Sequence, residues 1–156
     1  IMLRNPVDRA FSHWKMAARY GFEPLEFEEA LMNESERLDF GRSDVLPARG
    51  HDYVFQKLGY FTKGVYASFL KMWLHEFDRD QLLILQSEKM YNEPQEVYNR
   101  VLDFLELEPY NKVPFSLYNQ GGTRRMSDEI RAKLTNLYAK HNERLFELLG
   151  EKWDWS

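Results

Sequence analysis

An arginine and a serine eight positions apart form the first candidate binding site in this sequence. Arg4 follows a short apolar run, residues 1–3, which is typical of a strand. Asn5 and Pro6 are residue types that cap and open a helix, and Ser12 lies about two turns into that helix. A guanidinium and a hydroxyl beside a helix N-terminus favour binding of an anion such as a phosphate. A simpler interpretation also fits, in which Arg4 caps the strand and Ser12 is a serine on the helix surface.

A second basic cluster precedes the last predicted helix and contains Gly121, Gly122, Thr123, Arg124 and Arg125. Glycine allows backbone N–H groups to turn toward an anion, and the adjacent arginines place positive charge close to a helix N-terminus. The cluster is therefore a second candidate anion site. The alternative is an ordinary surface turn with solvated arginines.

Other polar residues carry weaker signals. Ser87 and Glu88 directly follow an apolar run typical of a buried strand, at the sheet edge where open α/β proteins bind ligands, so an adenine or ribose contact there is one hypothesis. None of the four histidines has metal-ligand spacing to another histidine or a carboxylate, so we expect no metal site. His51, in a long predicted loop, is the only one expected to be able to swing into a cleft. The catalytic residues stay unknown.

Composition limits the possible classes of protein. With 156 residues, 44% of them hydrophobic, the chain can bury one core, so we expect a single domain over residues 1–156. A net charge of −4 argues against general nucleic-acid binding, and no apolar run has the length of a membrane helix. There is no cysteine, which excludes disulfides and favours a reducing compartment such as the cytoplasm.

Hydrophobic periodicity predicts helices over residues 6–19, 24–38 and 61–77, a helix from residue 94, and a last helix with Ser127 as N-cap and Gly150 just past its end. Short strands are expected at 1–3 and 82–85, and irregular stretches at 39–57, with a short helical turn, and at 106–125. This alternating order predicts an α/β fold, a parallel sheet with helices on its faces. Two predicted helices should bury apolar residues, namely Tyr66, Phe69, Leu70, Trp73 and Leu74 in one, and Val97, Val101, Leu102 and Leu105 in the other.

Arg4-Asn5-Pro6 with Ser12 resembles the 3′-phosphate-binding segment of sulfotransferases that use PAPS (3′-phosphoadenosine-5′-phosphosulfate). Other segments, in the same order along the chain, resemble the bacterial and heparan-sulfate-sulfotransferase-like branch of that family. These segments are residues 27–31, 64–66, 73–74, 81–88, 104–105 and 142–155.

The resemblance implies a P-loop-like fold and transfer of a sulfuryl group from PAPS to a hydroxyl or amine of an acceptor, with a carbohydrate as the family-level expectation. It also implies that Arg4 and Ser12 bind the 3′-phosphate of PAPS or of adenosine 3′,5′-bisphosphate, and that residues 121–125 form a loop closing over it. Tyr60 and Tyr66 would border the acceptor and nucleotide pocket, although Tyr66 taken alone is more typical of a core residue.

The sequence departs from the family at one point, because no glycine- and lysine-containing loop for the 5′-phosphosulfate is recognisable. We therefore expect the carboxyl-terminal portion of a sulfotransferase domain, inactive by itself, whose partner would be the amino-terminal half of the same domain. The absence of cysteine favours a bacterial-type, cytoplasmic member. The alternative is a non-catalytic helical binding module derived from the same fold. The acceptor, the catalytic base and the oligomeric state are left open.

Overall fold

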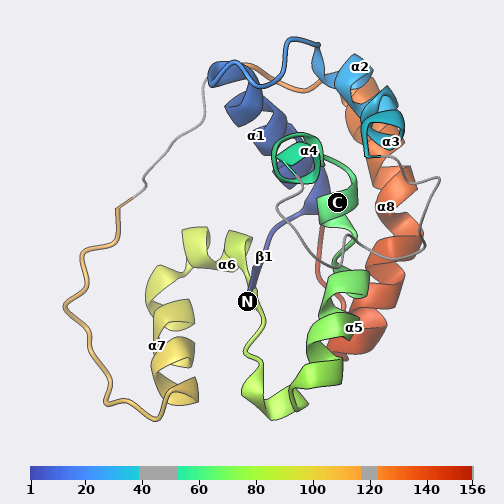
Figure 1. The fold of residues 1–156 in the computed structure, drawn as a ribbon. Coiled ribbons are helices and arrows are strands. Elements are labelled where there is room, and N and C mark those ends of the chain that lie inside the picture. Colours follow the sequence, from blue (N-terminus) through green and yellow to red (C-terminus); the bar gives the residue numbers. More distant parts are fainter. Residues whose placement is uncertain (39–52, 117–122, 156) are drawn as a thin grey trace. The chain divides into compact units, whose positions relative to one another are not determined.

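The computed structural model describes residues 1–38, 53–116 and 123–155. Figure 1 shows the helices and strands of the chain. Contacts group the chain into two compact units, the first made of Ile1–Asn5 and Ser68–Gln120 and the second of Pro6–Ala67 and Gly121–Ser156. Each unit combines two separate stretches of chain. The single domain expected over residues 1–156 stays a prediction.

The first unit contains a parallel pair of strands, β1 (Met2–Leu3) and β2 (Leu85–Gln86). Met2 is paired with Leu85 and Leu3 with Gln86. This pairing confirms the predicted α/β class with parallel strands. The apolar run 82–85 extends beyond the ladder on its N-terminal side, and Leu82 and Ile84 are nevertheless buried.

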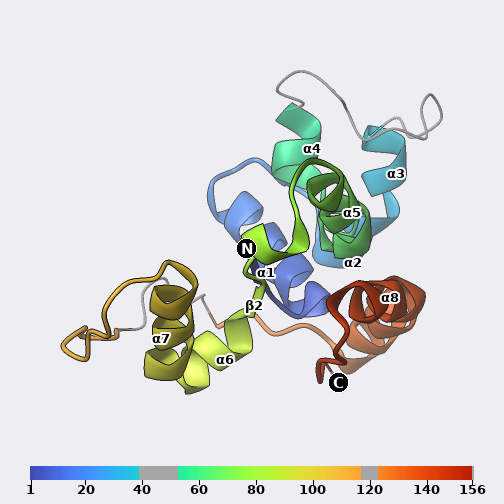
Figure 2. The ribbon, with the colours of Figure 1, turned by 90° about the horizontal axis from the view of Figure 1, so that it is seen from below.

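The first unit also contains most of α5 (Tyr66–Glu76), together with η2 (Arg79–Gln81), α6 (Ser87–Asn92) and α7 (Pro94–Phe104). α7 begins at Pro94 as predicted, and α6 packs against it (Figure 2). Val97 and Leu102 are buried, but Leu105 is 54% exposed because the helix ends at Phe104. α6 was not predicted, since six residues between a strand and a proline are too few to show a helical period.

The second unit is built around α1 (Pro6–Arg19) and α8 (Asp128–Leu149). Its other elements are α2 (Phe27–Met32), α3 (Glu34–Arg37), α4 (Tyr53–Leu58) and η1 (Thr62–Gly64), and α5 (Tyr66–Glu76) begins here. One face of α1 is apolar at helical spacing and packs into the core. The buried core of this unit comprises Val7, Ala10, Trp14, Ala17, Phe27, Ala30, Tyr60, Leu134 and Tyr138.

The ends of the two long helices follow local sequence signals. α1 is closed by Gly21, at φ 74°, with hydrogen bonds from Gly21 N to Ala18 O (3.1 Å) and from Phe22 N to Ala17 O (2.9 Å). At the start of α8 the Ser127 hydroxyl accepts a hydrogen bond from Ile130 N at 3.3 Å, and Gly150 ends the helix at φ 73°. Both predicted ends of the last helix are confirmed.

Two predicted helices differ from the observed ones. The helix expected over 24–38 is interrupted at Asn33 into α2 and α3, and Glu34 turns inward and is buried. The helix expected over 61–77 is the short turn η1 followed by α5. Trp73, expected to be buried, is 50% exposed, with its ring stacked on Phe77. Helical spacing in the sequence predicts which residues lie on the same face of a helix, but it does not predict whether another element packs on that face.

Candidate functional site

The carboxyl ends of β1 and β2 bring two of the predicted segments together in the first unit. The backbone N–H of Asn5 donates to Oε1 of Glu88 at 2.8 Å, and Arg4 lies half-buried beside it in the chain. The Ser87 hydroxyl and Oε2 of Glu88 are buried and have no hydrogen-bond partner among the described residues. Because buried polar atoms are normally satisfied, these two oxygens mark a place for a polar ligand group or a water.

Ser12 lies half-buried in α1, in the second unit, whereas Arg4 belongs to the first. On the helix, Ser12 follows Asp8 by one turn. Asp8 accepts a hydrogen bond from Nη2 of Arg131, on α8, at 2.7 Å. Arg131 is thus a cation near this face of α1 that the sequence analysis missed, because nothing local links residues 123 positions apart.

The described residues of the second basic cluster lie against α1, the helix that carries Ser12. The Arg124 guanidinium is 5.2 Å from the centre of the Trp14 ring and 3.6 Å from Oε2 of Glu26. Arg124 and Arg125 both line a cavity of about 450 Å³ together with Phe11 and Trp14. Thr123 is exposed, and Gly121 and Gly122 lie outside the described residues. The two arginines therefore share a surface with the aromatic face of α1.

The Tyr60–Thr62 segment, which precedes the predicted acceptor residue Tyr66, is held by polar groups from several helices. Tyr60 is fully buried, its hydroxyl donates to Glu23 at 3.0 Å, and Arg9 donates to its carbonyl. The Tyr138 hydroxyl donates to the Phe61 carbonyl at 2.8 Å. The burial of Tyr60 favours a packing role over direct contact with a substrate. Tyr66 is also largely buried, with 9% of its surface exposed.

Several ionisable groups of this framework have shifted pKa values, among them Glu23 and His13. Burial opposes ionisation of Glu23, but hydrogen bonds from Arg37, the Leu25 backbone and Tyr60 outweigh it and lower the pKa of its carboxyl group. Burial, together with the charges of Lys63 and Arg9, lowers the pKa of His13 to about 4. The His13 imidazole is therefore neutral near pH 7 and adds no positive charge next to Ser12. No cluster of metal-ligating side chains occurs within residues 1–38, 53–116 and 123–155.

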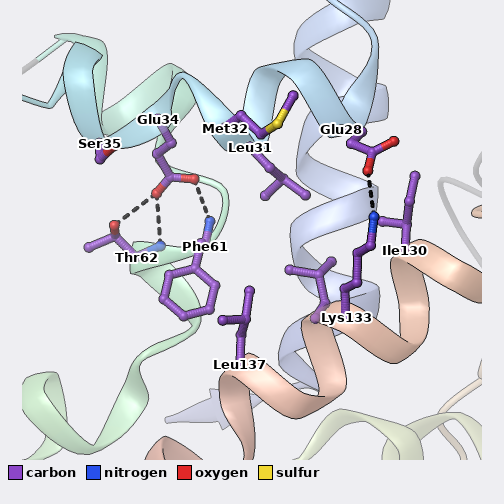
Figure 3. A pocket seen from close by; sticks show the side chains of 11 residues that line it. Glu28, Leu31, Met32, Glu34, Ser35, Phe61, Thr62, Ile130, Lys133 and Leu137 are labelled. Atoms are coloured by element: carbon purple, nitrogen blue, oxygen red, sulfur yellow. Dashed lines mark hydrogen bonds and ion pairs between the residues drawn. The ribbon is translucent and has the colours of Figure 1, made fainter.

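A separate, larger pocket lies in the second unit among α2, α3, η1 and α8 (Figure 3). Its volume is about 670 Å³, and its walls are mostly apolar. At one side the Glu34 carboxylate accepts hydrogen bonds from Phe61 N (2.6 Å), Thr62 N (2.9 Å) and the Thr62 hydroxyl (2.8 Å). At the other side, Lys133 forms an ion pair with Glu28 at 3.0 Å (Figure 3).

Residues 1–147 match the family model of the sulfotransferase domain. The chain belongs to this family. The match includes both basic clusters and Ser12, and it confirms the resemblance seen in the sequence. A sulfotransferase structure from Alicyclobacillus acidocaldarius is also similar, with a TM-score of 0.78 and 29% identity over 98% of this chain and 54% of that one. This likeness supports the predicted sulfotransferase fold.

Two curated sulfotransferases are similar to this chain. The membrane-associated sulfotransferase kil1 of Dictyostelium discoideum is 28% identical over 74% of the chain, and human carbohydrate sulfotransferase 15 is 26% identical over 97%. The chain spans only 24% and 30% of their respective lengths. Among the described residues, no helix is both long and apolar enough to span a membrane.

Proposed function

We propose that this chain takes part in sulfuryl transfer from PAPS to a hydroxyl or amine of an acceptor molecule. The observation that carries the proposal is the family match over residues 1–147, which contains every predicted nucleotide-binding residue. The chain covers about half of the similar bacterial structure, so the complete reaction is a proposal for this chain.

Arg4 and Ser12 would bind the 3′-phosphate, Arg4 through charge-assisted hydrogen bonds and Ser12 through its hydroxyl. Gly121, Gly122, Thr123, Arg124 and Arg125 would form a second group of donors to the same phosphate. The arginines can move to a ligand at low cost, because the ion pair of Arg124 with Glu26 joins side chains that are 61% and 78% exposed. At the end of β2, the Ser87 hydroxyl has no hydrogen-bond partner in the described part of the chain, which supports a contact to the nucleoside part of the ligand.

A carbohydrate is the proposed acceptor, supported by the similarity to human carbohydrate sulfotransferase 15. We propose Tyr66 as a residue bordering the acceptor and Tyr60 as a support for that segment. A cytoplasmic location is likewise proposed, from the absence of cysteine in the sequence. No general base is assigned.

Calorimetric titration with adenosine 3′,5′-bisphosphate tests the nucleotide site. Arg4→Ala should weaken binding about 10- to 150-fold, which corresponds to roughly 1.5–3 kcal/mol for a hydrogen bond to a charged group. Ser12→Ala should have a smaller effect, because a neutral donor is lost. Arg100→Ala, at an exposed position of α7, is the matched control and should leave the affinity unchanged.

Equal affinity of the wild type and Arg4→Ala would contradict the assignment of the phosphate site. The activity itself is tested by transfer of labelled sulfate from PAPS to a panel of sugars, with the chain alone and with the chain supplied with the amino-terminal half of a sulfotransferase domain. Nucleotide binding without transfer to any acceptor in either form would favour the non-catalytic binding module.

A further inference from the structure

We propose that the apolar pocket among α2, α3, η1 and α8 binds a small ligand that has an apolar body and a cationic amine. None of the predicted phosphate-binding residues lines this pocket, although Glu28 and Ile130 also line the cavity of Arg124 and Arg125. The proposal does not rest on sulfuryl transfer. A volume of about 670 Å³ lies within the range of small-molecule sites, roughly 300–1,000 Å³.

The walls of the pocket account for the apolar part of the ligand. Six apolar side chains line it, from α2, from the segment before η1 and from α8 (Figure 3): Leu31, Met32, Phe61, Ile130, Leu134 and Leu137. Two of them are strongly solvent-exposed, Met32 at 68% and Leu137 at 60%. A ligand placed between them would remove apolar surface of both residues from water, which is favourable.

Glu34, the polar group on the inner side, already uses most of its hydrogen-bonding capacity within the protein. Both carboxylate oxygens of Glu34 already accept hydrogen bonds, Oε1 from the N–H and the hydroxyl of Thr62 and Oε2 from Phe61 N. A ligand rich in hydroxyl groups, such as a sugar, would lose hydrogen bonds to water against the apolar walls and could replace only a few of them. The interior therefore selects an apolar body.

The charged side chains at the rim of the pocket favour a cationic group on the ligand. Lys133 Nζ lies 3.0 Å from Oε1 of Glu28 and 3.0 Å from Oε1 of Glu129, so one ammonium is shared by two carboxylates. This cluster keeps one negative charge in excess. On the neighbouring surface, Arg124 pairs with a different carboxylate, that of Glu26. An amine at the rim would gain a carboxylate partner, whereas an anionic ligand would meet repulsion.

Three probes of equal size and different charge test the proposal: phenylbutylamine, phenylbutanol and phenylbutanoate. Methionine methyl groups labelled with carbon-13 report the binding by NMR, with the Met32 signal assigned through its loss in Met32→Leu. Met72, 54% exposed in the first unit, is the internal control. We expect a saturable shift of Met32 alone, and roughly two- to fivefold tighter binding of the amine than of the alcohol, since exposed charges interact weakly. High salt should remove this preference.

Variants test the apolar walls and the carboxylates at the rim separately. Leu137→Arg places a charge among the apolar walls at an exposed helical position and should weaken the binding of all three probes, roughly tenfold or more for the amine. Leu107→Arg, at a leucine that is 53% exposed in the first unit, is the matched control and should change nothing. The double variant Glu28→Gln/Glu129→Gln should remove the advantage of the amine while retaining the binding of the alcohol.

The proposal is overturned if no probe shifts the Met32 signal, if Met72 shifts as much as Met32, or if phenylbutanoate binds as tightly as phenylbutylamine. It is also overturned if Leu137→Arg binds the amine like the wild type.

Discussion

The carboxylate of Glu34 accepts two hydrogen bonds from Thr62 through a single oxygen, one from the backbone N–H at 2.9 Å and one from the hydroxyl at 2.8 Å. The other oxygen accepts the N–H of Phe61 at 2.6 Å. A buried side chain on α3 thus fixes the start of η1, the turn that leads to Tyr66. Several expected outcomes depend on this framework.

Glu34→Gln should lower the free energy of unfolding by about 1–3 kcal/mol, because one acceptor and the negative charge are lost while the donors stay buried. Urea denaturation followed by circular dichroism measures the change. Glu36→Gln, on the same short helix but exposed, is the matched control and should shift stability by less than about 0.5 kcal/mol. Equal effects of the two substitutions would show that Glu34 does not hold η1.

Gly64→Ala should also destabilise the protein, because a Cβ at this position would lie 2.5 Å from the Tyr138 hydroxyl oxygen and 2.8 Å from its ring. Overpacking of this kind costs about 1–3 kcal/mol. Thermal unfolding of Gly64→Ala, Tyr138→Leu and the double variant forms a cycle that isolates the clash. We expect the double variant to be more stable than the sum of the single changes predicts. Strict additivity would rule out the close approach as the cause.

Stability should fall as the pH decreases from about 6.5 toward 4 because of His13. Its pKa is lowered by burial to about 4 in the folded protein, from 6.5 in the unfolded chain. In this interval the unfolded state binds a proton that the folded state does not, so stability is fully present above pH 6.5 and decreases below it.

Urea denaturation at closely spaced pH values measures this dependence. His13→Gln should flatten the profile within the interval, and the His75→Gln control, at an exposed position of α5, should retain the wild-type slope. The Glu23 carboxyl group, whose pKa is lowered, adds a further loss of stability as the pH falls below its ordinary value of 4.5. The difference between wild type and His13→Gln isolates His13, and two parallel profiles would contradict its protonation as the cause.

Replacing both Arg124 and Arg125 by alanine should weaken binding of adenosine 3′,5′-bisphosphate and reduce its salt dependence, since fewer cations then face the phosphates. Trp14 fluorescence should also change in Arg124→Ala, because the guanidinium lies 5.2 Å from the centre of its ring. Calorimetry at two salt concentrations measures the first effect. Unchanged affinity and salt dependence would identify the pair as solvated surface residues.

Capping residues and apolar runs in the sequence predict a large part of the fold. Pro6, Ser127 and Gly150 act on backbone groups within a few residues, so the bounds of α1 and α8 followed from the sequence. The two apolar runs separated by helices also indicated parallel strands, which pair in the structure as β1 and β2. The motifs of the sulfotransferase family were recognisable for the same reason, because each is a short, continuous stretch of chain.

The tertiary structure alone decided which of these residues meet. Asn5 and Glu88 are 83 positions apart, and Lys133 and Glu28 are 105 positions apart, so no local pattern joins them. The same holds for the burial of Tyr60, the inward turn of Glu34 and the placement of Arg124 on Trp14. Propensity and capping act over a few residues, whereas burial and charge pairing depend on elements brought together by packing.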